Sequence, residues 1–445
     1  MPVSPARAAA FDILLRVETE DSYATELLHS ELCAHLSAAD QGLATELVMG
    51  VLRWRSALDR AFAQVSTQRR EKMDAEVLVA LRLGAYQLGW LERIPAHAAI
   101  HESVELVKRA RKRSAAPFAN AVLRKLAASL KSFQPVLTQG MVDAGTIAAT
   151  LAHPEWLVQT WCSQFGLEAA QKICTYDQAV PGTAIRLDPM EVEKTLCNHG
   201  IQLAPGVFLS SARRVVAGDV TKAEAYFEGR IAIQDEASQL IAALVGEGKR
   251  ILDCCAAPGG KTAAIAQRNP EATIIATEKH GRRAELLRKR VRASNVEVVH
   301  GDVQDLPARE PFDRVLVDVP CSGTGTLARH PEIKWRLKPE DLNDLPMRQA
   351  AILQAAMQHV APEGRLIYST CSLQREEDEE VVEKALRENP GFRLSNAQGQ
   401  LEELRVRGEL VLQPYDSLLS GRFLRTIPGV HPCDGFFAAV LERTE

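Results

Sequence analysis

Two cysteines, Cys321 and Cys371, each follow a run of residues that is typical of a buried strand. The runs are Val317-Asp318-Val319-Pro320 before the first thiol and Tyr368-Ser369-Thr370 before the second. A single cysteine on a strand is usually a small packing residue. Two at the ends of neighbouring strands, beside the carboxylate of Asp318, indicate nucleophilic chemistry by a thiolate. A helix expected near Arg375 would favour the Cys371 thiolate through its dipole, whereas the acidic run Glu376–Glu380 opposes that effect.

An earlier predicted strand is followed by a turn that could hold a small polar ligand. Its Pro-Gly-Gly turn at the start of a helix lets a ligand approach backbone N–H groups. A triphosphate-binding loop would need glycine at position 255, where Cys255 stands, and the dinucleotide pattern Gly-x-Gly-x-x-Gly is absent. The residues of the turn are Cys255, Ala256, Ala257, Pro258, Gly259, Gly260 and Lys261.

Two further strands end in acids. Glu278 is placed to accept hydrogen bonds from ribose hydroxyls, and Asp302 could accept one from an exocyclic amine. Each acid alone is more often a cap or a surface charge. A glycine turn, an acid and a second acid after three successive strands predict a pocket for a nucleoside-shaped cofactor.

The elements that position these residues alternate between strand and helix from about residue 231 onward. This alternation predicts an α/β fold with a doubly wound, mostly parallel sheet, whose ligands lie beyond the carboxyl ends of the strands. The predicted strands are Arg250–Cys255, Thr273–Glu278, Glu297–Asp302, Asp313–Val319, Arg365–Thr370 and Phe436–Leu441.

Residues 1–140 predict an all-helical domain, because apolar residues recur at three- and four-residue spacings. The stretch Lys108–Lys131 contains eight cations and no acid. A solvated helix face usually mixes charge signs, so we favour a surface that contacts a phosphate backbone over a merely solvated face. The predicted helices are Ala8–Val17, Ala44–Val65, Ala75–Leu91 and Ala98–Ala110. The candidate RNA-binding residues are Lys108, Arg109, Arg111, Lys112, Arg113, Arg124 and Lys125, with Lys131 in the same stretch.

Residues 146–230 predict a small α+β module, which the sequence leaves open as an RNA-binding module or a linker. Its predicted elements are a helix at His153–Phe165, a strand at Ala184–Leu187, a helix at Met190–Asn198 and a strand at Val207–Leu209. With residues 231–445 as the third part, the division 1–140, 146–230 and 231–445 agrees with the three domains expected of 445 residues.

Composition excludes several classes of protein. A hydrophobic content of 46% and a net charge of −4 exclude global disorder. The nine cysteines are odd in number and include no Cys-x-x-Cys pair, so we expect reduced thiols, no disulfide framework and no metal site. Asp12 interrupts the first apolar stretch, and no uncharged apolar run is long enough for a membrane span. We therefore expect a cytoplasmic protein.

The motifs around both cysteines resemble those of the S-adenosylmethionine-dependent RNA cytosine-5 methyltransferases. The helical N-terminal part resembles the NusB-like domain of a family member that acts on 16S ribosomal RNA. The C-terminal resemblance rests on Gly229–Gln239, Cys255–Lys261, Asp318–Gly325, Tyr368–Ser372 and His431–Phe437, and the N-terminal one on Tyr86–Leu88, Arg93–Ala98 and Ala121–Arg124.

The resemblance implies S-adenosylmethionine as cofactor and 16S ribosomal RNA, free or partly assembled, as partner. It implies that Cys255–Lys261 surround the methionine and ribose end and that Glu278, where the family usually has Asp, takes the ribose hydroxyls. It assigns Asp302 to the adenine, Asp318 to the methyl and target base, and Cys371 to attack on carbon 6 of cytosine. Cys321 then assists product release, a division of roles that the residues alone leave open.

Three other functions compete with this interpretation. The same chemistry could act on tRNA or on another ribosomal RNA cytosine. A non-catalytic RNA-binding or antitermination-type protein would need neither the two cysteines nor Asp318. A dehydrogenase is the weakest alternative, because the glycine pattern of dinucleotide binding is absent.

Overall fold

The computed structural model describes residues 3–444 except 21, 130–141, 188–190 and 308–309. Contacts between residues divide the chain into two units, and each is described here by itself. The helical unit comprises Met1–Val180 and Leu327–Arg336, and the sheet unit comprises Pro181–Thr326 and Leu337–Glu445.

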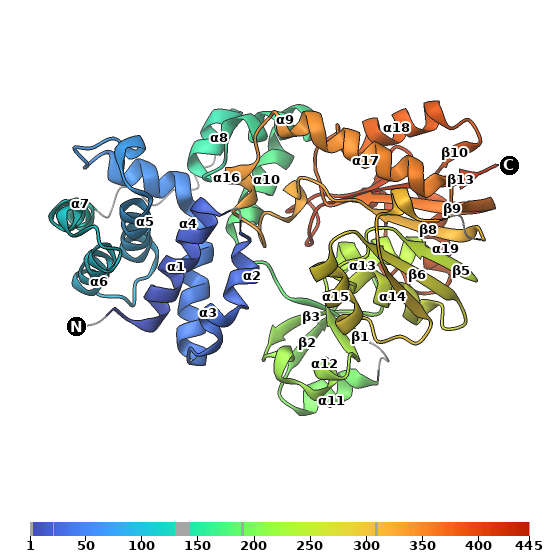
Figure 1. Ribbon diagram of the computed structural model, residues 1–445, viewed down its shortest axis with the longest axis horizontal. Helices are drawn as coiled ribbons and strands as arrows, with labels where there is room; N and C mark the ends of the chain where they lie inside the picture. The colour runs from blue at the N-terminus through green and yellow to red at the C-terminus, as the bar shows by residue number, and fades with distance from the viewer. Residues whose placement is uncertain (1–2, 21, 130–141, 188–190, 308–309, 445) are drawn as a thin grey trace. The chain divides into compact units, whose positions relative to one another are not determined.

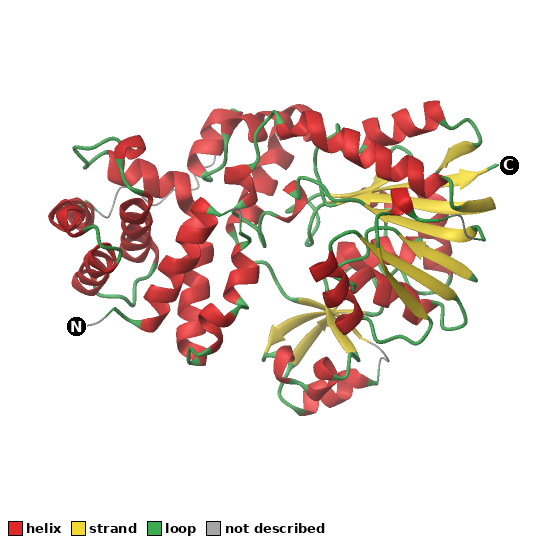
Figure 2. Cartoon of the chain, in the orientation of Figure 1, coloured by secondary structure: helices red, strands yellow, loops and turns green. Residues whose placement is uncertain are grey.

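Helices α1 to α7 of the helical unit pack their apolar residues into one core, and they confirm the all-helical prediction for the N-terminal part (Figures 1 and 2). The four predicted helices are all present, whereas α2, α3 and α7 were not predicted. The helices are α1 (Pro5–Thr19), α2 (Ala24–Leu28), α3 (Glu31–Ala34), α4 (Ala38–Ala63), η1 (Arg70–Lys72), α5 (Ala75–Trp90), α6 (Ala96–Arg109), η2 (Arg113–Ala115), α7 (Ala116–Ala128), α8 (Ala144–Thr150), α9 (Glu155–Phe165) and α10 (Leu167–Gln178).

A segment from later in the chain, Leu327–Arg336, also belongs to the helical unit and includes α16 (Ile333–Arg336). The buried carboxylate of Glu332 accepts a hydrogen bond from the Ala24 N–H at 3.0 Å. The indole of Trp335 donates to the carbonyl of Leu52 at 2.6 Å. These long-range bonds anchor the segment, which begins six residues after Cys321. No sequence pattern predicted that this segment belongs to the helical unit.

The predicted middle module is divided between the two units. Helices α8–α10 belong to the helical unit, whereas the strands belong to the sheet unit. These strands form an antiparallel sheet in the order β2-β3-β1-β4, not a β-α-β unit. The strand predicted at Val207–Leu209 is wrong, since Leu209 makes only an isolated bridge to Leu410. The elements are β1 (Ala184–Leu187), α11 (Val192–Asn198), β2 (Gln202–Pro205), β3 (Ala212–Ala217), η4 (Val220–Lys222), α12 (Glu224–Phe227) and β4 (Ile231–Ile233).

The rest of the sheet unit is built on a nine-stranded sheet, in which β10 pairs with β13 beside the path β11-β12-β13-β9-β8-β5-β6-β7. All six predicted strands are present. The expectation of a mostly parallel sheet is corrected, because only β7-β6-β5-β8-β9 run parallel and the strands beyond β9 pair antiparallel. The strands are β5 (Arg250–Asp253), β6 (Thr273–Glu278), β7 (Val296–His300), β8 (Phe312–Asp318), β9 (Val360–Thr370), β10 (Phe392–Ser395), β11 (Leu419–Ser420), β12 (Phe423–Thr426) and β13 (Phe436–Arg443).

Helices cover both faces of this sheet (Figure 2). Successive residues of β5 enter different cores: Ile251 packs with α13, α14 and α19, and Leu252 packs with α17 and α18. Successive side chains of a strand point to opposite faces of its sheet, so this alternation shows that β5 is buried on both faces. The helices are α13 (Glu236–Leu244), α14 (Gly260–Arg268), α15 (Gly281–Arg290), η5 (Val303–Asp305), η6 (Thr324–Thr326), α17 (Asp341–Met357), α18 (Glu379–Glu388), α19 (Ala397–Val406) and η7 (Asp416–Leu418).

Candidate active site

A cavity of about 740 Å³ lies at the carboxyl ends of the parallel strands of the sheet unit. It is lined by residues that follow β5, β6, β7, β8 and β9, where an open α/β sheet binds its ligands. Among the predicted site residues, Cys255, Ala257, Glu278, Asp302, Asp318, Cys321 and Cys371 line it. The other turn residues, Ala256, Pro258, Gly259, Gly260 and Lys261, are not among its lining.

The turn between β5 and α14 requires glycine at position 259. Its φ of +106° is a left-handed conformation, and a Cβ there would lie 2.7 Å from Val291 and 2.9 Å from Leu287. The turn therefore packs closely against α15. Beneath it, the Thr262 hydroxyl donates to the buried Asp253 carboxylate at 2.7 Å. Burial raises the pKa of Asp253 to about 7.

The two predicted cofactor-binding acids are held by neighbouring groups. Glu278 is buried, accepts a hydrogen bond from the His280 N–H at 2.9 Å, and lies 3.8 Å from Arg283. Asp302 accepts from the Gln304 N–H at 3.0 Å and pairs with Lys279 at 3.0 Å. Burial opposes the charge of Asp302, but the bonds to Gln304 and Lys279 prevail and lower its pKa. Both side chains therefore offer fixed acceptors to the cavity.

Asp318 lies between the turn and the thiol-bearing strand ends. One oxygen accepts a hydrogen bond from Lys261 at 2.8 Å and the other accepts from the Ser369 hydroxyl at 2.7 Å. Burial opposes the charge of Lys261, but the Asp318 carboxylate outweighs it and raises the pKa of the ammonium. The ammonium also lies 4.8 Å from the centre of the Phe436 ring. Lys261 thus orients Asp318.

The two predicted thiols lie side by side, with the sulfurs of Cys321 and Cys371 3.3 Å apart and both cysteines unoxidised. The hydrogen bond with Cys371, together with burial, raises the pKa of Cys321 well above its ordinary value. The helix expected near Arg375 begins only at Glu379, so its N-terminus does not adjoin Cys371. The predicted effect of a helix dipole on this thiol is therefore wrong.

A buried carboxylate that sequence reasoning missed, Glu377, connects the two cysteine loops. One oxygen accepts hydrogen bonds from the Ser322 N–H and the Gln349 amide, each at 2.8 Å. The other accepts from the hydroxyls of Ser322 and Ser372. Because Ser322 directly follows Cys321 and Ser372 directly follows Cys371, Glu377 fixes one thiol-bearing loop relative to the other. The acidic run contains five residues, with nothing in their types to mark that Glu377 and Asp378 are the two fully buried ones.

The segments Gly229–Gln239 and His431–Phe437, on which the family resemblance partly rests, also meet near the thiols. The Gly325 N–H donates to the Cys371 carbonyl at 2.9 Å, and the Gly435 N–H donates to the Gly325 carbonyl at 2.7 Å. A Cβ on Gly325 would lie 2.2 Å from the Gly435 oxygen, so this approach requires glycine. The Asp434 N–H in turn donates to Asp235 at 3.2 Å. The bond between Asp434 and Asp235 joins segments that are 199 residues apart in sequence.

Within the helical unit, acids from outside the predicted basic stretch neutralise several of its cations. Arg109 pairs with Asp12 at 2.7 Å, Lys112 with Asp74 at 3.0 Å, and Lys108 with Glu105 at 2.7 Å. Four predicted cations make no ion pair with a described residue, namely Arg111, Arg113, Arg124 and Lys125. Lys131 lies outside the described residues.

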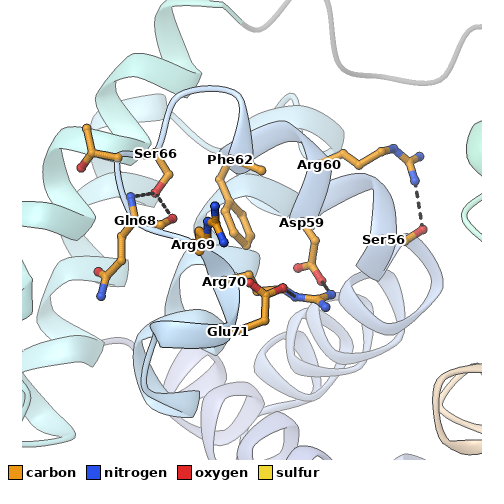
Figure 3. Close-up of a pocket in the computed structure, with 11 residues that line it drawn as sticks. Ser56, Asp59, Arg60, Phe62, Ser66, Gln68, Arg69, Arg70 and Glu71 are labelled. Atoms are coloured by element: carbon orange, nitrogen blue, oxygen red, sulfur yellow. Dashed lines mark hydrogen bonds and ion pairs between the residues drawn. The ribbon is translucent and has the colours of Figure 1, made fainter.

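A second cavity, of about 450 Å³, lies in the helical unit at the end of α4 (Figure 3). Arg70 on its wall pairs with Asp59 at 3.2 Å and lies 3.4 Å from Glu71, and Arg60 donates to the Ser56 hydroxyl. None of the predicted site residues lines it. Its polar groups largely satisfy one another, so we assign no ligand to it.

Among the residues that the structure describes, no group of three or more His, Cys, Asp or Glu side chains could hold a metal ion. Over the same residues, no helix has the length and apolar character needed to span a membrane.

A sheet with this strand order, carrying a glycine turn and two acids around one cavity, defines a Rossmann-like S-adenosylmethionine-dependent methyltransferase. The residues present fit that cofactor, because acids after consecutive strands suit its ribose and adenine and the cavity extends from them to both thiols. Residues 241–442 match the family described as 16S rRNA methyltransferase RsmB/F, and residues 4–128 match the NusB family.

Whole-length relatives give the same result. The chain is 31% identical to the probable ribosomal RNA small subunit methyltransferase B of Bacillus subtilis over 459 residues, covering 100% of both. It is 33% identical to the ribosomal RNA small subunit methyltransferase B of Pseudomonas putida, covering 93% of this chain and 94% of that protein. The chain therefore belongs to the RsmB/F family of RNA methyltransferases. The crystal structure of PH0851 shares the fold, with a TM-score of 0.79 and 21% identity over 100% of both chains.

Proposed function

We propose that this enzyme transfers a methyl group to carbon 5 of a cytosine in 16S ribosomal RNA through a covalent cysteine–cytosine intermediate. The observation that carries the proposal is the pair of thiols, with sulfurs 3.3 Å apart, on the wall of one cavity that also contains Asp318. Carbon 5 of cytosine is a poor nucleophile until a thiolate adds to carbon 6, and two thiols suit a reaction with an addition and an elimination.

Cys371 attacks in this scheme. Cys371 first loses its thiol proton to solvent. The thiolate forms a bond to carbon 6, and the electron pair of the 5,6 double bond moves into the ring as an acid donates a proton to ring nitrogen 3. Asp318, held by Lys261 and Ser369, is the group positioned to assist that protonation. Bound S-adenosylmethionine supplies an electrophilic methyl on a sulfonium that leaves as a neutral thioether. Carbon 5 takes that methyl.

Cys321 completes the cycle. Once the Cys371 sulfur is bonded to carbon 6, the Cys321 thiol beside it is the group that can act as a base. Cys321 gives its proton to solvent, and its thiolate then removes the proton from carbon 5. The 5,6 double bond re-forms, Cys371 leaves as thiolate, and ring nitrogen 3 returns its proton to the acid that supplied it.

Other residues bind the cofactor and RNA. Cys255–Lys261 surround the methionine and ribose end, Glu278 takes the ribose hydroxyls and Asp302 takes the adenine amine. The RNA contacts assigned to the helical unit are Lys108, Arg109, Arg111, Lys112, Arg113, Arg124 and Lys125. Since the target base must leave its stack to reach a thiol, we expect single-stranded or loop RNA as substrate, free or partly assembled.

The test follows transfer of a labelled methyl group from S-adenosylmethionine to unmodified small-subunit RNA, with tRNA as the competing substrate. Cys371→Ala should abolish transfer and form no adduct. Cys321→Ala should lose turnover and accumulate a protein–RNA conjugate that survives a denaturing gel, because the cycle stalls after addition. An adduct only with Cys371→Ala would reverse the two roles. Near-normal transfer by both variants would remove the thiols from the mechanism, and preferred labelling of tRNA would overturn the substrate.

A further inference from the structure

The helix α15 and the residues just after it carry a dense run of positive charge. From Gly281 to Arg292 the chain has six cations and one acid, Glu285. Only Ala284 and Leu287 of the helix are buried, so its charged side chains face outward. The cations are Arg282, Arg283, Arg288, Lys289, Arg290 and Arg292.

Neighbouring acids do not neutralise this helix. Arg282, Lys289 and Arg290 make no ion pair with any described residue, and Arg288 donates only to the Val298 carbonyl at 3.3 Å. The nearest carboxylate to any of these cations is Glu278, which lies 3.8 Å from Arg283. A protein with a net charge of −4 that leaves most of such a cluster without an acidic partner presents a site for a polyanion.

Two exposed aromatic side chains lie at one end of the same surface. Tyr226 and Phe227 on α12 are 37% and 65% exposed, and their rings meet edge to face with centroids 5.8 Å apart. The Phe227 carbonyl accepts a hydrogen bond from Arg292 at 3.0 Å, which joins α12 to the end of α15 (Figure 1). Exposed aromatic faces beside cations suit unstacked bases, because stacking requires a base that is not paired within a duplex.

The other end of the surface reaches the cavity. Arg283, in the first turn of α15, is one of the residues that line it, together with Glu278 and Cys371. We propose that α15 and the Tyr226–Phe227 pair form a surface beside the cavity, and that this surface binds the single-stranded RNA flanking the target base. This inference rests on the proposed function and specifies where the sheet unit holds its substrate strand.

The experiment uses the full chain and a labelled single-stranded RNA of about 16 nucleotides, the upper range of such sites. A variant combining Arg282→Gln, Lys289→Gln and Arg290→Gln should bind this RNA about tenfold more weakly. The slope of log affinity against log salt should fall by about 2, since each phosphate that is no longer neutralised lowers the slope by about 0.7. Arg283 is left unchanged because it lines the cavity.

The matched control removes three exposed arginines of the same unit that already pair with acids. Arg393 pairs with Glu442, Arg405 with Glu402, and Arg407 with Glu247. The combined glutamine variant has the same net charge as the α15 variant and should keep the parent affinity within about twofold. Equal weakening by both variants would reduce the effect to net charge and overturn the surface.

A second variant tests the aromatic pair. Phe227→Leu should weaken binding of the single strand about fivefold or more and leave a duplex of the same sequence unaffected, because only unpaired bases stack. Weakening of both RNAs alike, or of neither, would overturn base stacking here. Calorimetry with S-adenosylmethionine should match the parent in every variant, which separates weakened RNA binding from misfolding.

The design separates this inference from the proposed function. If the parent binds RNA but transfers no methyl group, the proposed function fails and the surface is still tested by binding. If the parent transfers methyl groups and the α15 variant binds RNA as the control does, only the surface fails. Competition by poly-glutamate as strong as by RNA would overturn RNA as the occupant.

Discussion

The pocket of the sheet unit and the basic stretch of the helical unit hold their charges in different ways. Around the thiols, the buried Glu377 accepts four hydrogen bonds from three residues. In the basic stretch, Arg109 is 45% exposed and is paired with Asp12, while neighbouring Arg111 makes no ion pair with a described residue. The pocket groups are each held by several bonds, whereas the surface cations have one partner or none.

This difference indicates where single substitutions should act strongly. A buried polar group that loses its partner costs the full free energy of its missing hydration, whereas an exposed ion pair contributes little because water screens it. The pocket should therefore respond sharply to one change, and the basic stretch should respond only to several changes together.

The largest expected effect is that of Glu377→Ala on stability. The change leaves the Ser322 N–H, two serine hydroxyls and the Gln349 amide without their acceptor in a buried environment. Since each such group costs about 1–3 kcal/mol and some can re-pair, we expect a loss of about 3–5 kcal/mol in the free energy of unfolding. Urea denaturation measures it, with Glu383→Ala on the exposed face of α18 as control. Equal midpoints for the two variants would contradict the buried network.

The next effect is a pH dependence from Asp253. Burial raises the pKa of this carboxyl from 3.8 to about 7, so between those values the folded chain keeps a proton that the unfolded chain has released. Its contribution to stability is complete below about pH 4 and is lost as the pH rises to about 7, at up to about 1.4 kcal/mol per pH unit. Asp253→Asn should lack this component. The measurement is the urea midpoint of parent and variant from about pH 5 to about pH 8. Midpoints that change in parallel would exclude a contribution of Asp253 to the pH dependence of stability.

A smaller effect is expected at Asp302, which lines the pocket and which we propose binds the cofactor adenine. Asp302→Ala should weaken S-adenosylmethionine binding by about 1.5–3 kcal/mol, the size of a charge-assisted hydrogen bond, and leave RNA binding unchanged. Calorimetric titration measures it. Asp305→Ala, an exposed acid three residues away, should bind the cofactor as the parent does. An unchanged affinity for the Asp302 variant would remove this residue from the cofactor site.

The sequence predicted the pocket well because its information is local to strand ends. Glu278, Asp318 and Cys371 each follow a short Val- and Ile-rich run, and parallel strands bring such ends to one edge. In the antiparallel half of the sheet, the sequence predicted β13 but not β10, β11 or β12, since β11 and β12 are only 2 and 4 residues long and depend on pairing with one another and with β13.

Features that depend on distant partners were missed. The serine that follows each cysteine is ordinary in sequence, and only the fold brings Glu377 to both. Similarly, the basic stretch contains no acid, yet Asp12 and Asp74 approach it from far along the chain. A count of charges within a segment therefore describes the surface only after the tertiary partners are known.

The smallest effects are expected within the basic stretch, where paired and unpaired cations can be compared. Replacing Arg111, Arg113, Arg124 and Lys125 with Gln should weaken RNA binding and lower the salt slope by up to about 3, or about 0.7 for each phosphate that a cation had neutralised. Replacing Lys108, Arg109 and Lys112 should lower it less, because these side chains must leave Glu105, Asp12 and Asp74 to reach a phosphate. That exchange offsets part of the attraction that each cation contributes.

Binding of small-subunit RNA at several salt concentrations decides the comparison. A larger change of slope for the unpaired set would show that unpaired cations contact RNA and paired ones chiefly hold the helices together. A larger change for the paired set would mean that RNA displaces the acids. Parent-like binding by both sets would make the stretch a solvated face. Because Arg109 and Asp12 are both exposed, Arg109→Gln alone should change stability by no more than about 1 kcal/mol, which keeps the binding result free of unfolding.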